Sequence, residues 1–445
     1  MKKIIVLALA LCLALSFAMS ASAADVINVM TFTDEVPGMI TKYFEAHPEL
    51  AEKYEVKTTI IATTDNLYEP ALDQALAAGD SNSPDIYCAE SAFVLKYTQG
   101  IASEYAAPYE DLGIDVAGLT EAADIAKYTI EIGTRPSDGK LVGLGYQATG
   151  GAFIYRRSIA LDTWGNDDPA FVAEKIGAGS GNWDAFFAAA AELKEKGYAI
   201  VSGDGDMWHA VENSSDGAWI VDGKLNIDPK REAFLDYSKT LKDNGYHHDT
   251  QDWQEGWFAD MKKDGGVFGY YGPAWLINYT IGANCGEGDE SSYGDWAVCA
   301  PNVGFFWGGT WVMAGKTVVG TEKAAVVADI IKWITLDTDE ESLQYKWANG
   351  TLNGEGGTKD TVASGVVMAK SNGEMDFLAG QDMFEVFVPA NQYANGSNMT
   401  QFDATINTYW RDAVRQYTAG NLSREDAIAA FKQNVADNLD VEVDF

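Results

Sequence analysis

The stretch YEPALDQALAAGDSNSPDIY, residues 68–87, decides the fold class because its hydrophobic period changes partway along. Its first half places apolar residues on one helix face, and Gly79 then supplies a residue that commonly ends helices. Its second half runs from Pro84 to Tyr87 and into Cys88, and is typical of a short buried strand. The β-branched segment 56–62 precedes the helix. This strand–helix–strand order predicts an α/β domain with a largely parallel sheet.

The same alternation of elements continues on both sides of this stretch. We expect a strand over 26–31 and part of a helix over 39–44, so the chain opens with a βαβαβ unit. Further along we expect helices over 182–197, 324–334 and 423–435, and strands over 198–202 and 266–271. No repeat, low-complexity tract or long Pro/Ser linker separates these elements, so we expect interleaved domains.

The N-terminus has the three parts of a secretory signal peptide. Met1-Lys2-Lys3 is positively charged, an apolar run follows to about Met19, and Ala21-Ser22-Ala23 matches a cleavage site. The apolar run is too short for a lone membrane anchor. We therefore predict a signal peptide over 1–23 and an exported protein, in a periplasm or at a cell surface.

The composition limits the size of the fold and its partners. A chain of 445 residues exceeds one ordinary hydrophobic core, which favours two domains. It carries 66 acidic and 31 basic residues, a net charge of −35, and such a surface repels nucleic acid and anionic lipid. We expect a folded monomer that has no nucleic-acid partner.

Three cysteines follow the predicted signal peptide. In an exported protein, Cys285 and Cys299 are plausible disulfide partners that would close a small loop. Cys88 would then remain unpaired.

Sequence motifs for catalysis and cofactors are missing or incomplete. Gly315-Lys316-Thr317 resembles the end of a phosphate-binding loop, but the glycine that this loop requires at position 310 is Thr310. The chain has neither a G-x-S-x-G nor an H-E-x-x-H motif, and it has only four histidines. We expect no catalytic residue, no metal site and no cofactor. A pair of carboxylates for glycoside hydrolysis remains an alternative.

Tryptophan is frequent in loop-like positions beside glycine and aspartate. Sugar rings offer C–H faces that stack on aromatic rings and hydroxyls that pair with carboxylates and amides. By this logic the candidate ligand contacts in the second half are Asp204, Trp208, Trp253, Tyr271, Trp275, Trp307 and Trp311. The tryptophans expected in the core, because they lie in helical patterns, are Trp183, Trp333, Trp347 and Trp410.

Several segments together resemble the family 1 extracellular solute-binding proteins of ABC transporters, a group that serves oligosaccharide importers. The similar segments, in chain order, are residues 68–87, LVGLGYQATGGAFIYRRSIA (141–160), NWDAFFAAAAELKEKG (182–197), GGVFGYYGPAWLINYT (265–280), WAVCAPNVGFFWGGTWVMAG (296–315) and KAAVVADIIKWIT (323–335). They span nearly the whole chain after the predicted signal peptide, and their order carries more weight than any one motif.

The resemblance implies a two-lobe, periplasmic-binding-protein-like α/β fold with a ligand cleft between the lobes. The N-terminal lobe would comprise 24–137 and 304–350, and the C-terminal lobe 138–303 and 351–445. Hinge strands would lie near 136–141 and 300–303, and closure would occur by hinge bending.

The resemblance also implies further ligand contacts at the cleft. Thr33 and Asp34 follow the first strand and Glu90 follows the third, at carboxyl strand ends where α/β folds bind ligands. Tyr146 and Gln147 follow the expected crossing into the second lobe. Gly308 and Gly309 would let the backbone approach the ligand, where a side chain would block it.

These expectations describe a sugar receptor without catalysis. The expected partners are a carbohydrate, most simply an oligosaccharide, and the permease subunits of an ABC importer. Two alternatives stay open: the same fold binding a polyamine or peptide, and a secreted carbohydrate-active enzyme. Salt dependence separates a polyamine from a neutral sugar, because only the charged ligand is screened.

Overall fold

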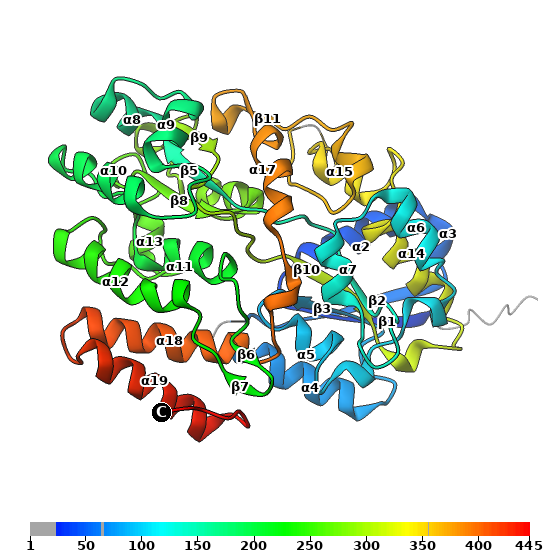
Figure 1. Ribbon diagram of the computed structural model, residues 1–445. Helices are drawn as coiled ribbons and strands as arrows, with labels where there is room; N and C mark the ends of the chain where they lie inside the picture. Colours follow the sequence, from blue (N-terminus) through cyan, green and yellow to red (C-terminus); the bar gives the residue numbers. More distant parts are fainter. Residues whose placement is uncertain (1–23, 64–65, 355) are drawn as a thin grey trace, which may run out of the picture.

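The computed structural model describes residues 24–63, 66–354 and 356–445. The predicted signal peptide lies outside this part of the chain. The described residues form two α/β lobes side by side, with the N-terminal strands in one lobe and the C-terminal helices in the other (Figure 1). No helix in these three ranges is long and apolar enough to cross a bilayer.

The first lobe is built on a five-stranded sheet in the order β2-β1-β3-β10-β4. Its strands are β1 (Asp25–Thr31), β2 (Tyr54–Ile60), β3 (Ile86–Glu90), β4 (Gly143–Gly145) and β10 (Thr310–Ala314). β1 pairs in parallel with β2 and β3, whereas β10 runs antiparallel between β3 and β4. β10 is buried along its whole length, as expected for a strand that is covered on both faces.

Helices cover this sheet, and one of them ends at the residue that the sequence predicts. They are α2 (Glu35–Ala46), α3 (Pro48–Ala51), α4 (Tyr68–Ala78), α5 (Val94–Thr98), α6 (Val116–Ala123), α7 (Lys127–Gly133), α14 (Ala324–Thr335), α15 (Leu343–Ala348) and α16 (Gly365–Met368). Gly79 ends α4 in the left-handed conformation, with a φ of 61°. This confirms the predicted stop, because a residue with a Cβ is strained at that φ.

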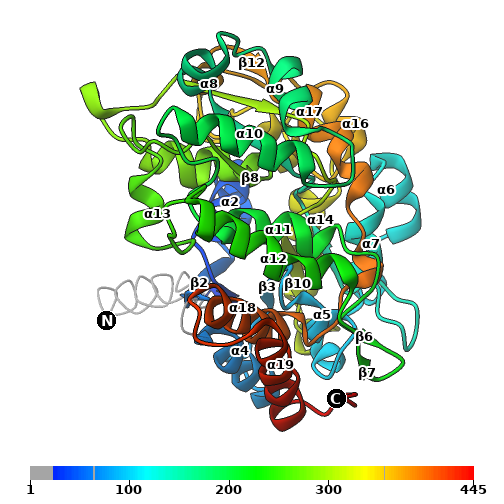
Figure 2. The same ribbon diagram turned by 60° about the vertical axis from the view of Figure 1, so that its left-hand side comes forward.

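The second lobe has a shorter, antiparallel sheet in the order β8-β5-β9. Its strands are β5 (Ala152–Arg156), β8 (Gly269–Gly272) and β9 (Trp296–Cys299), and a small hairpin adds β6 (Ile220–Val221) and β7 (Lys224–Leu225). Its helices are α8 (Arg157–Trp164), α9 (Pro169–Ile176), α10 (Asp184–Glu195), α11 (Asp204–Asn213), α12 (Pro229–Asn244), α13 (Glu255–Ala259), α18 (Asp403–Thr418) and α19 (Arg424–Asn438). Figure 2 brings α10, α11 and α12 forward, in front of β8.

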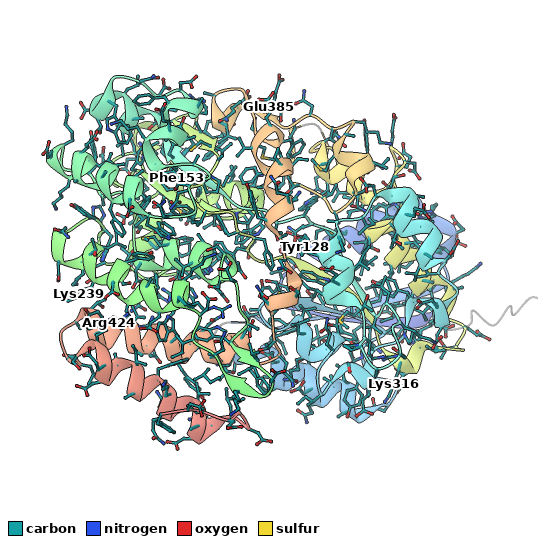
Figure 3. The ribbon with its side chains drawn as sticks, viewed as in Figure 1. Tyr128, Phe153, Lys239, Lys316, Glu385 and Arg424 are labelled. Carbon is teal, nitrogen blue, oxygen red and sulfur yellow. The ribbon has the colours of Figure 1, made fainter. Side chains whose placement is uncertain are left out.

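Two segments carry the chain between the sheets. Residues 146–151 connect β4 of the first sheet to β5 of the second, and residues 300–309 connect β9 back to β10. Tyr128, labelled near the lobe boundary in Figure 3, contacts both segments. Its hydroxyl accepts a hydrogen bond from the Thr149 amide at 3.0 Å, and its ring centroid lies 5.3 Å from that of Phe306.

The positions of these crossings refine the predicted hinges. The crossing at 300–309 contains the segment 300–303 that was expected there, but the other crossing begins after the predicted 136–141. The reason is that β4 pairs with β10, which keeps 143–145 in the first sheet. Residues 138–145, which the predicted boundary assigned to the second lobe, therefore continue the first.

A further connection runs through α17 (Phe384–Ala390), which lies between the lobes in Figure 1. The preceding hairpin of β11 (Glu374–Met375) and β12 (Gln381–Asp382) contacts the second sheet, because the Gln381 side chain bonds both backbone groups of Val298. After α17, the turn at Gly396–Asn398 packs on α7 of the first lobe, and α18 then enters the second lobe.

The structure of the second lobe departs from the predicted strand at 198–202 and decides the disulfide that the sequence left open. Residues 198–202 do not form a continuous strand, because only Ala199 and Val201 make isolated bridges. Cys285 and Cys299 are not disulfide-bonded; both are buried free thiols, as is Cys88. Burial raises the pKa of the Cys88 thiol to about 12 and raises that of Cys299 further, which keeps both protonated.

Candidate functional site

A tryptophan cluster, defined here as Trp253, Trp275 and Trp307, lies where the crossing 300–309 meets the second lobe. The rings of Trp275 and Trp307 are 4.8 Å apart in an edge contact, and Trp253 lies 6.2 Å from Trp307. Trp253 and Trp275 are nearly parallel, with centroids 6.3 Å apart. The structure therefore brings together three of the predicted ligand contacts from separate loops.

The backbone explains why Trp275 and Trp307 hold this arrangement. Trp275 Nε1 donates a hydrogen bond to the Trp307 carbonyl at 3.2 Å. Gly308 has a φ of 73°, and a Cβ built on it would lie 3.2 Å from the Trp275 ring. Gly308 thus gives space to an aromatic ring of the protein, whereas the sequence predicted that it would give space to the ligand.

Trp307 is held from a second side, whereas Trp253 is partly exposed. The His209 ring stacks on Trp307 at 3.6 Å, with an angle of 11° between the planes. Burial lowers the pKa of His209, so the imidazole is neutral at pH 7 and stacks as an uncharged ring. Trp253 has a φ of 66°, which is unusual for a bulky residue, and 39% of its surface is exposed.

The loop that carries Trp253 is fixed by its neighbour Asp252. Arg411 makes two hydrogen bonds to the Asp252 carboxylate, at 2.9 and 3.0 Å. Although burial opposes ionisation, Arg411 and His209 hold the pKa of Asp252 well below its usual range. A residue held in a sparsely populated conformation by a paired charge is a feature that often marks functional sites.

A cavity of about 290 Å³ adjoins the tryptophan cluster, and we call it the aromatic cavity. Its lining residues are Glu35, Trp275, Asn278, Tyr279, Trp347, Thr358 and Asp360. Glu35 begins α2 of the first lobe, whereas Trp275, Asn278 and Tyr279 follow β8 of the second, so the cavity lies between the lobes.

Both carboxyl groups of the aromatic cavity titrate abnormally. Burial, then the negative charges of Asp360 and Asp34, raises the pKa of Glu35 from 4.5 to about 8. Burial raises the pKa of Asp360 from 3.8 to about 6, although hydrogen bonds from Gln147, at 2.8 Å, and from the Thr361 amide oppose this rise. At pH 7 the cavity therefore holds a mostly protonated Glu35 and a mostly ionised Asp360.

A second cavity, the polar cavity, has a volume of about 280 Å³. Its lining residues are Glu212, Asn213, Ser214, Ser215, Asp216, Arg231, Gly304, Tyr393, Asn395, Asn398, Met399 and Asp403. Burial raises the pKa of Glu212 to about 7 and that of Asp403 to about 6, while Arg231 lowers both. Glu90 of β3 also raises the pKa of Glu212, which places this predicted contact near the polar cavity.

The remaining first-lobe predictions divide between the cavities and the core. Asp34 lies beside Glu35 but is not among the residues that line the aromatic cavity, and Thr33 before it is partly buried. Gln147 lines neither of these two cavities, but it holds Asp360 in place. Tyr146 is fully buried in the hydrophobic core, because the segment after β4 runs inside the protein.

Three predicted aromatic contacts and two other residues serve the structure of the lobes instead. Trp208 is 2% exposed and packs on Phe234, because it lies on the inner face of α11. Trp311 is buried in β10, and Tyr271 is buried and donates its hydroxyl to Asn302 at 2.6 Å. Asp204 accepts a hydrogen bond from Ser238, and the Gly309 carbonyl accepts one from the Ser91 amide.

Sequence reasoning missed six lining residues of the aromatic cavity: Glu35, Asn278, Tyr279, Trp347, Thr358 and Asp360. Tyr279 lies four residues after Trp275, a helical spacing that would have placed it on the same face. Trp347 was expected in the core and is indeed only 8% exposed, yet its surface borders the cavity. No local signal marks Asp360, which is far from Glu35 in the sequence.

Two α/β lobes joined by crossing segments, with cavities at their boundary, define a cleft-type binding protein. The family profile described as bacterial extracellular solute-binding protein matches residues 39–372. This match covers well over half of the chain, so the chain belongs to that family, which is extracytoplasmic. A search of the curated proteins found no match.

Solved structures share the fold at low sequence identity. A family 1 extracellular solute-binding protein is 19% identical with a TM-score of 0.71, over 93% of this chain and 99% of that one. The galacto-N-biose-/lacto-N-biose I-binding protein of the ABC transporter from Bifidobacterium longum is 18% identical with a TM-score of 0.67, over 95% and 100%. The GacH receptor of Streptomyces glaucescens, solved with acarbose, is 16% identical with a TM-score of 0.65, over 94% and 98%. These likenesses establish the two-lobe fold predicted from the sequence.

Proposed function

We propose that this protein is the extracytoplasmic receptor of an ABC importer and that it captures an oligosaccharide between its lobes. The observation that carries this proposal is the tryptophan cluster at the lobe boundary, beside a cavity lined by carboxyl and amide groups. Structural neighbours with this fold were solved with lacto-N-biose and with acarbose, which supports a sugar as the ligand.

The chemistry of the cluster suits a sugar ring. Trp253 and Trp275 retain exposed ring surface on which C–H faces can stack. Asn278 and Asp360 in the adjoining cavity supply hydrogen-bonding groups for hydroxyls. In this proposal the protein binds its ligand without breaking a bond in it.

Closure of the lobes would complete the site. The segments 146–151 and 300–309 connect the two sheets, so bending there would bring Glu35 of α2 towards Trp275 and Tyr279. The closed, ligand-bound form is the species that we propose the permease of the importer recognises.

Calorimetric titration of the mature protein tests the proposal. The ligands are xylo-, manno-, malto-, gluco- and galacto-oligosaccharides, and chromatography of each mixture checks for cleavage. We expect one series to bind with micromolar or tighter affinity and to remain intact. Trp307→Ala should abolish this binding, whereas Trp164→Ala, which changes a tryptophan of α8 remote from both cavities, should retain it. Cleavage of a ligand would instead establish an enzyme.

A further inference from the structure

The two carboxyl groups of the aromatic cavity have no cationic partner among the described residues. Neither Glu35 nor Asp360 forms an ion pair with any residue in the described parts of the chain, and no basic residue contributes to the pKa shift of either. The nearest lysine in the sequence, Lys359, donates its Nζ to the carbonyls of Asn372 and Glu374 at 3.0 and 2.8 Å. Its charge is therefore used elsewhere.

Three other acids of low exposure are paired with cations: Asp252 with Arg411 at 2.9 Å, Asp85 with Lys323 at 2.6 Å and Asp295 with Arg156 at 2.7 Å. The buried Asp206 is instead satisfied by hydrogen bonds from two backbone amides and from Trp257. Burying a carboxylate without a cation costs free energy. Glu35 lies in the first turn of α2, where the helix dipole favours an anion, but this favourable term acts on only one of the two carboxyl groups.

The aromatic walls of the cavity, like its carboxyl groups, are suited to bind a cation. Three of its seven lining residues are aromatic: Trp275, Tyr279 and Trp347. The faces of such rings attract ammonium groups, most strongly in desolvated sites. Burial, then the charges of Glu35 and Asp34, raises the pKa of the Tyr279 phenol, and Glu35 lines the same cavity as this ring.

From this arrangement we infer that the aromatic cavity binds an alkylammonium group of the ligand, between the carboxyl groups of Glu35 and Asp360 and the rings of Trp275 and Tyr279. This inference rests on the proposed binding function and narrows its ligand class to amine-bearing molecules. An amino sugar with a free amine and a linear polyamine share this chemistry. The cavity volume of about 290 Å³ fits one such group with a ring or a short chain attached.

A proton should leave the protein when the ammonium group binds. Glu35, whose pKa is about 8, carries a proton at pH 7, and it faces the acids Asp360 and Asp34, the neutral phenol of Tyr279 and the protonated thiol of Cys88. A bound cation favours the ionised form of Glu35 and so lowers its pKa. Binding of a permanently charged amine should therefore strengthen between pH 6 and pH 8, with release of up to one proton at pH 7.

The test compares ligands that carry a free amine with matched neutral sugars. Calorimetry at pH 7, in two buffers with different ionisation enthalpies, would use the β-1,4-linked glucosamine disaccharide, its N-acetylated form, cellobiose and spermidine. We expect an amine to bind at least about tenfold more tightly than the matched neutral sugar. Spermidine, which stays protonated at pH 7, should also release protons from the protein on binding. Tighter binding of the glucosamine disaccharide would assign an amino sugar, and tighter binding of spermidine would assign a polyamine.

Single substitutions test which carboxyl groups cause the preference for an amine. Glu35→Gln should abolish both the preference for the amine and the release of protons. Asp360→Asn should weaken the preference, although the new asparagine oxygen can still accept the hydrogen bond from Gln147. Glu385→Gln is the matched control, because Glu385 is exposed on α17, where Figure 3 labels it. Thermal melting of each variant would check that it is folded.

Two results would overturn the inference, and they are distinguishable. If cellobiose or another neutral sugar binds as tightly as the amines, and Glu35→Gln binds like the unchanged protein, the inference is wrong but the receptor function stands. If no sugar and no amine binds the folded protein, both the inference and the proposed function fail.

Discussion

The two cavities at the lobe boundary show opposite treatments of buried acids. The polar cavity contains Glu212 and Asp403 together with Arg231, whose guanidinium lies 4.5 Å from the centre of the Trp219 ring. The aromatic cavity contains Glu35 and Asp360 without a cation among the described residues. The protein thus supplies the positive charge of the polar cavity, whereas in our inference the ligand supplies that of the aromatic cavity.

The two cavities also differ in whether their residues contribute mainly to stability or mainly to ligand binding. Arg231 donates hydrogen bonds to the carbonyls of Gly217 and Glu212 at 2.8 and 3.4 Å, so it ties α12 to the end of α11. Across the aromatic cavity, Asn278 donates a hydrogen bond to the Lys359 carbonyl at 2.6 Å, but no buried cation joins the two walls among the described residues. We therefore expect changes at the polar cavity to act mainly on folding and changes at the aromatic cavity to act mainly on affinity.

The largest expected effect is the loss of Arg231. Arg231→Met leaves Glu212 and Asp403 buried without a positive charge, which should lower the free energy of unfolding by about 3 kcal/mol or more. Lys230→Met is the control, because Lys230 makes an exposed ion pair with Asp216 and its loss should cost about 0–1 kcal/mol. Urea unfolding measures both. Equal effects of the two variants would show that Arg231 does not balance the negative charge of Glu212 and Asp403.

The next effect concerns affinity and compares one aromatic residue from each cavity. Trp275→Ala removes a wall of the aromatic cavity and should weaken ligand binding by about 2 kcal/mol, or roughly 30-fold. Tyr393→Ala removes a half-exposed ring that lines the polar cavity and should weaken it less. Calorimetry with the ligand found by titration would rank the two. The reverse order would move the main binding site to the polar cavity.

A more gradual effect is expected in the pH dependence of stability. The pKa of Glu35 rises on folding from 4.5 to about 8, so the folded state holds a proton that the unfolded state releases above pH 4.5. Glu35 therefore makes the free energy of unfolding fall as pH rises from about 5 to 8, by at most about 1.4 kcal/mol per pH unit. Glu35→Gln should flatten this decline.

Glu212→Gln should flatten the decline over a narrower range, because the pKa of Glu212 reaches only about 7 in the presence of Arg231. Urea unfolding at four pH values would separate the two variants. Identical slopes for Glu35→Gln and the unchanged protein would show that Glu35 ionises normally.

The sequence predicts the fold far better than it predicts the site. Periodicity and end signals identify α4 with its stop at Gly79 and α14 within a residue or two, since these depend on neighbours along the chain. Trp208 and Trp275 both follow a Gly/Asp- or Gly/Pro-rich turn, yet one is core and the other lines a cavity. Which of them faces the cleft depends on packing between distant segments.

Whether a buried acid has a cationic partner also depends on residues that are distant in the sequence. Nothing near Asp360 in the sequence indicates that Glu35 shares its cavity or that Lys359 points away. The Gly308-Gly309 pair was recognised as a place of close approach, but the group that approaches could be identified only from the structure. It is the Trp275 ring, one wall of the aromatic cavity.

This close approach gives the smallest of the predicted effects, and it tests whether the aromatic cavity is built by the backbone. Gly308→Ala places a Cβ 3.2 Å from the Trp275 ring and also strains a φ of 73°. Gly320→Ala is a matched control, because Gly320 has a φ of 77° but no atom within 4 Å of the added Cβ. Both variants should lose about 1 kcal/mol of stability from backbone strain. Only Gly308→Ala should also weaken ligand binding, since it displaces Trp275 from the cavity wall. If the two variants bind ligand equally well, the position of Trp275 does not depend on the glycine, and the aromatic cavity tolerates more movement than its packing indicates.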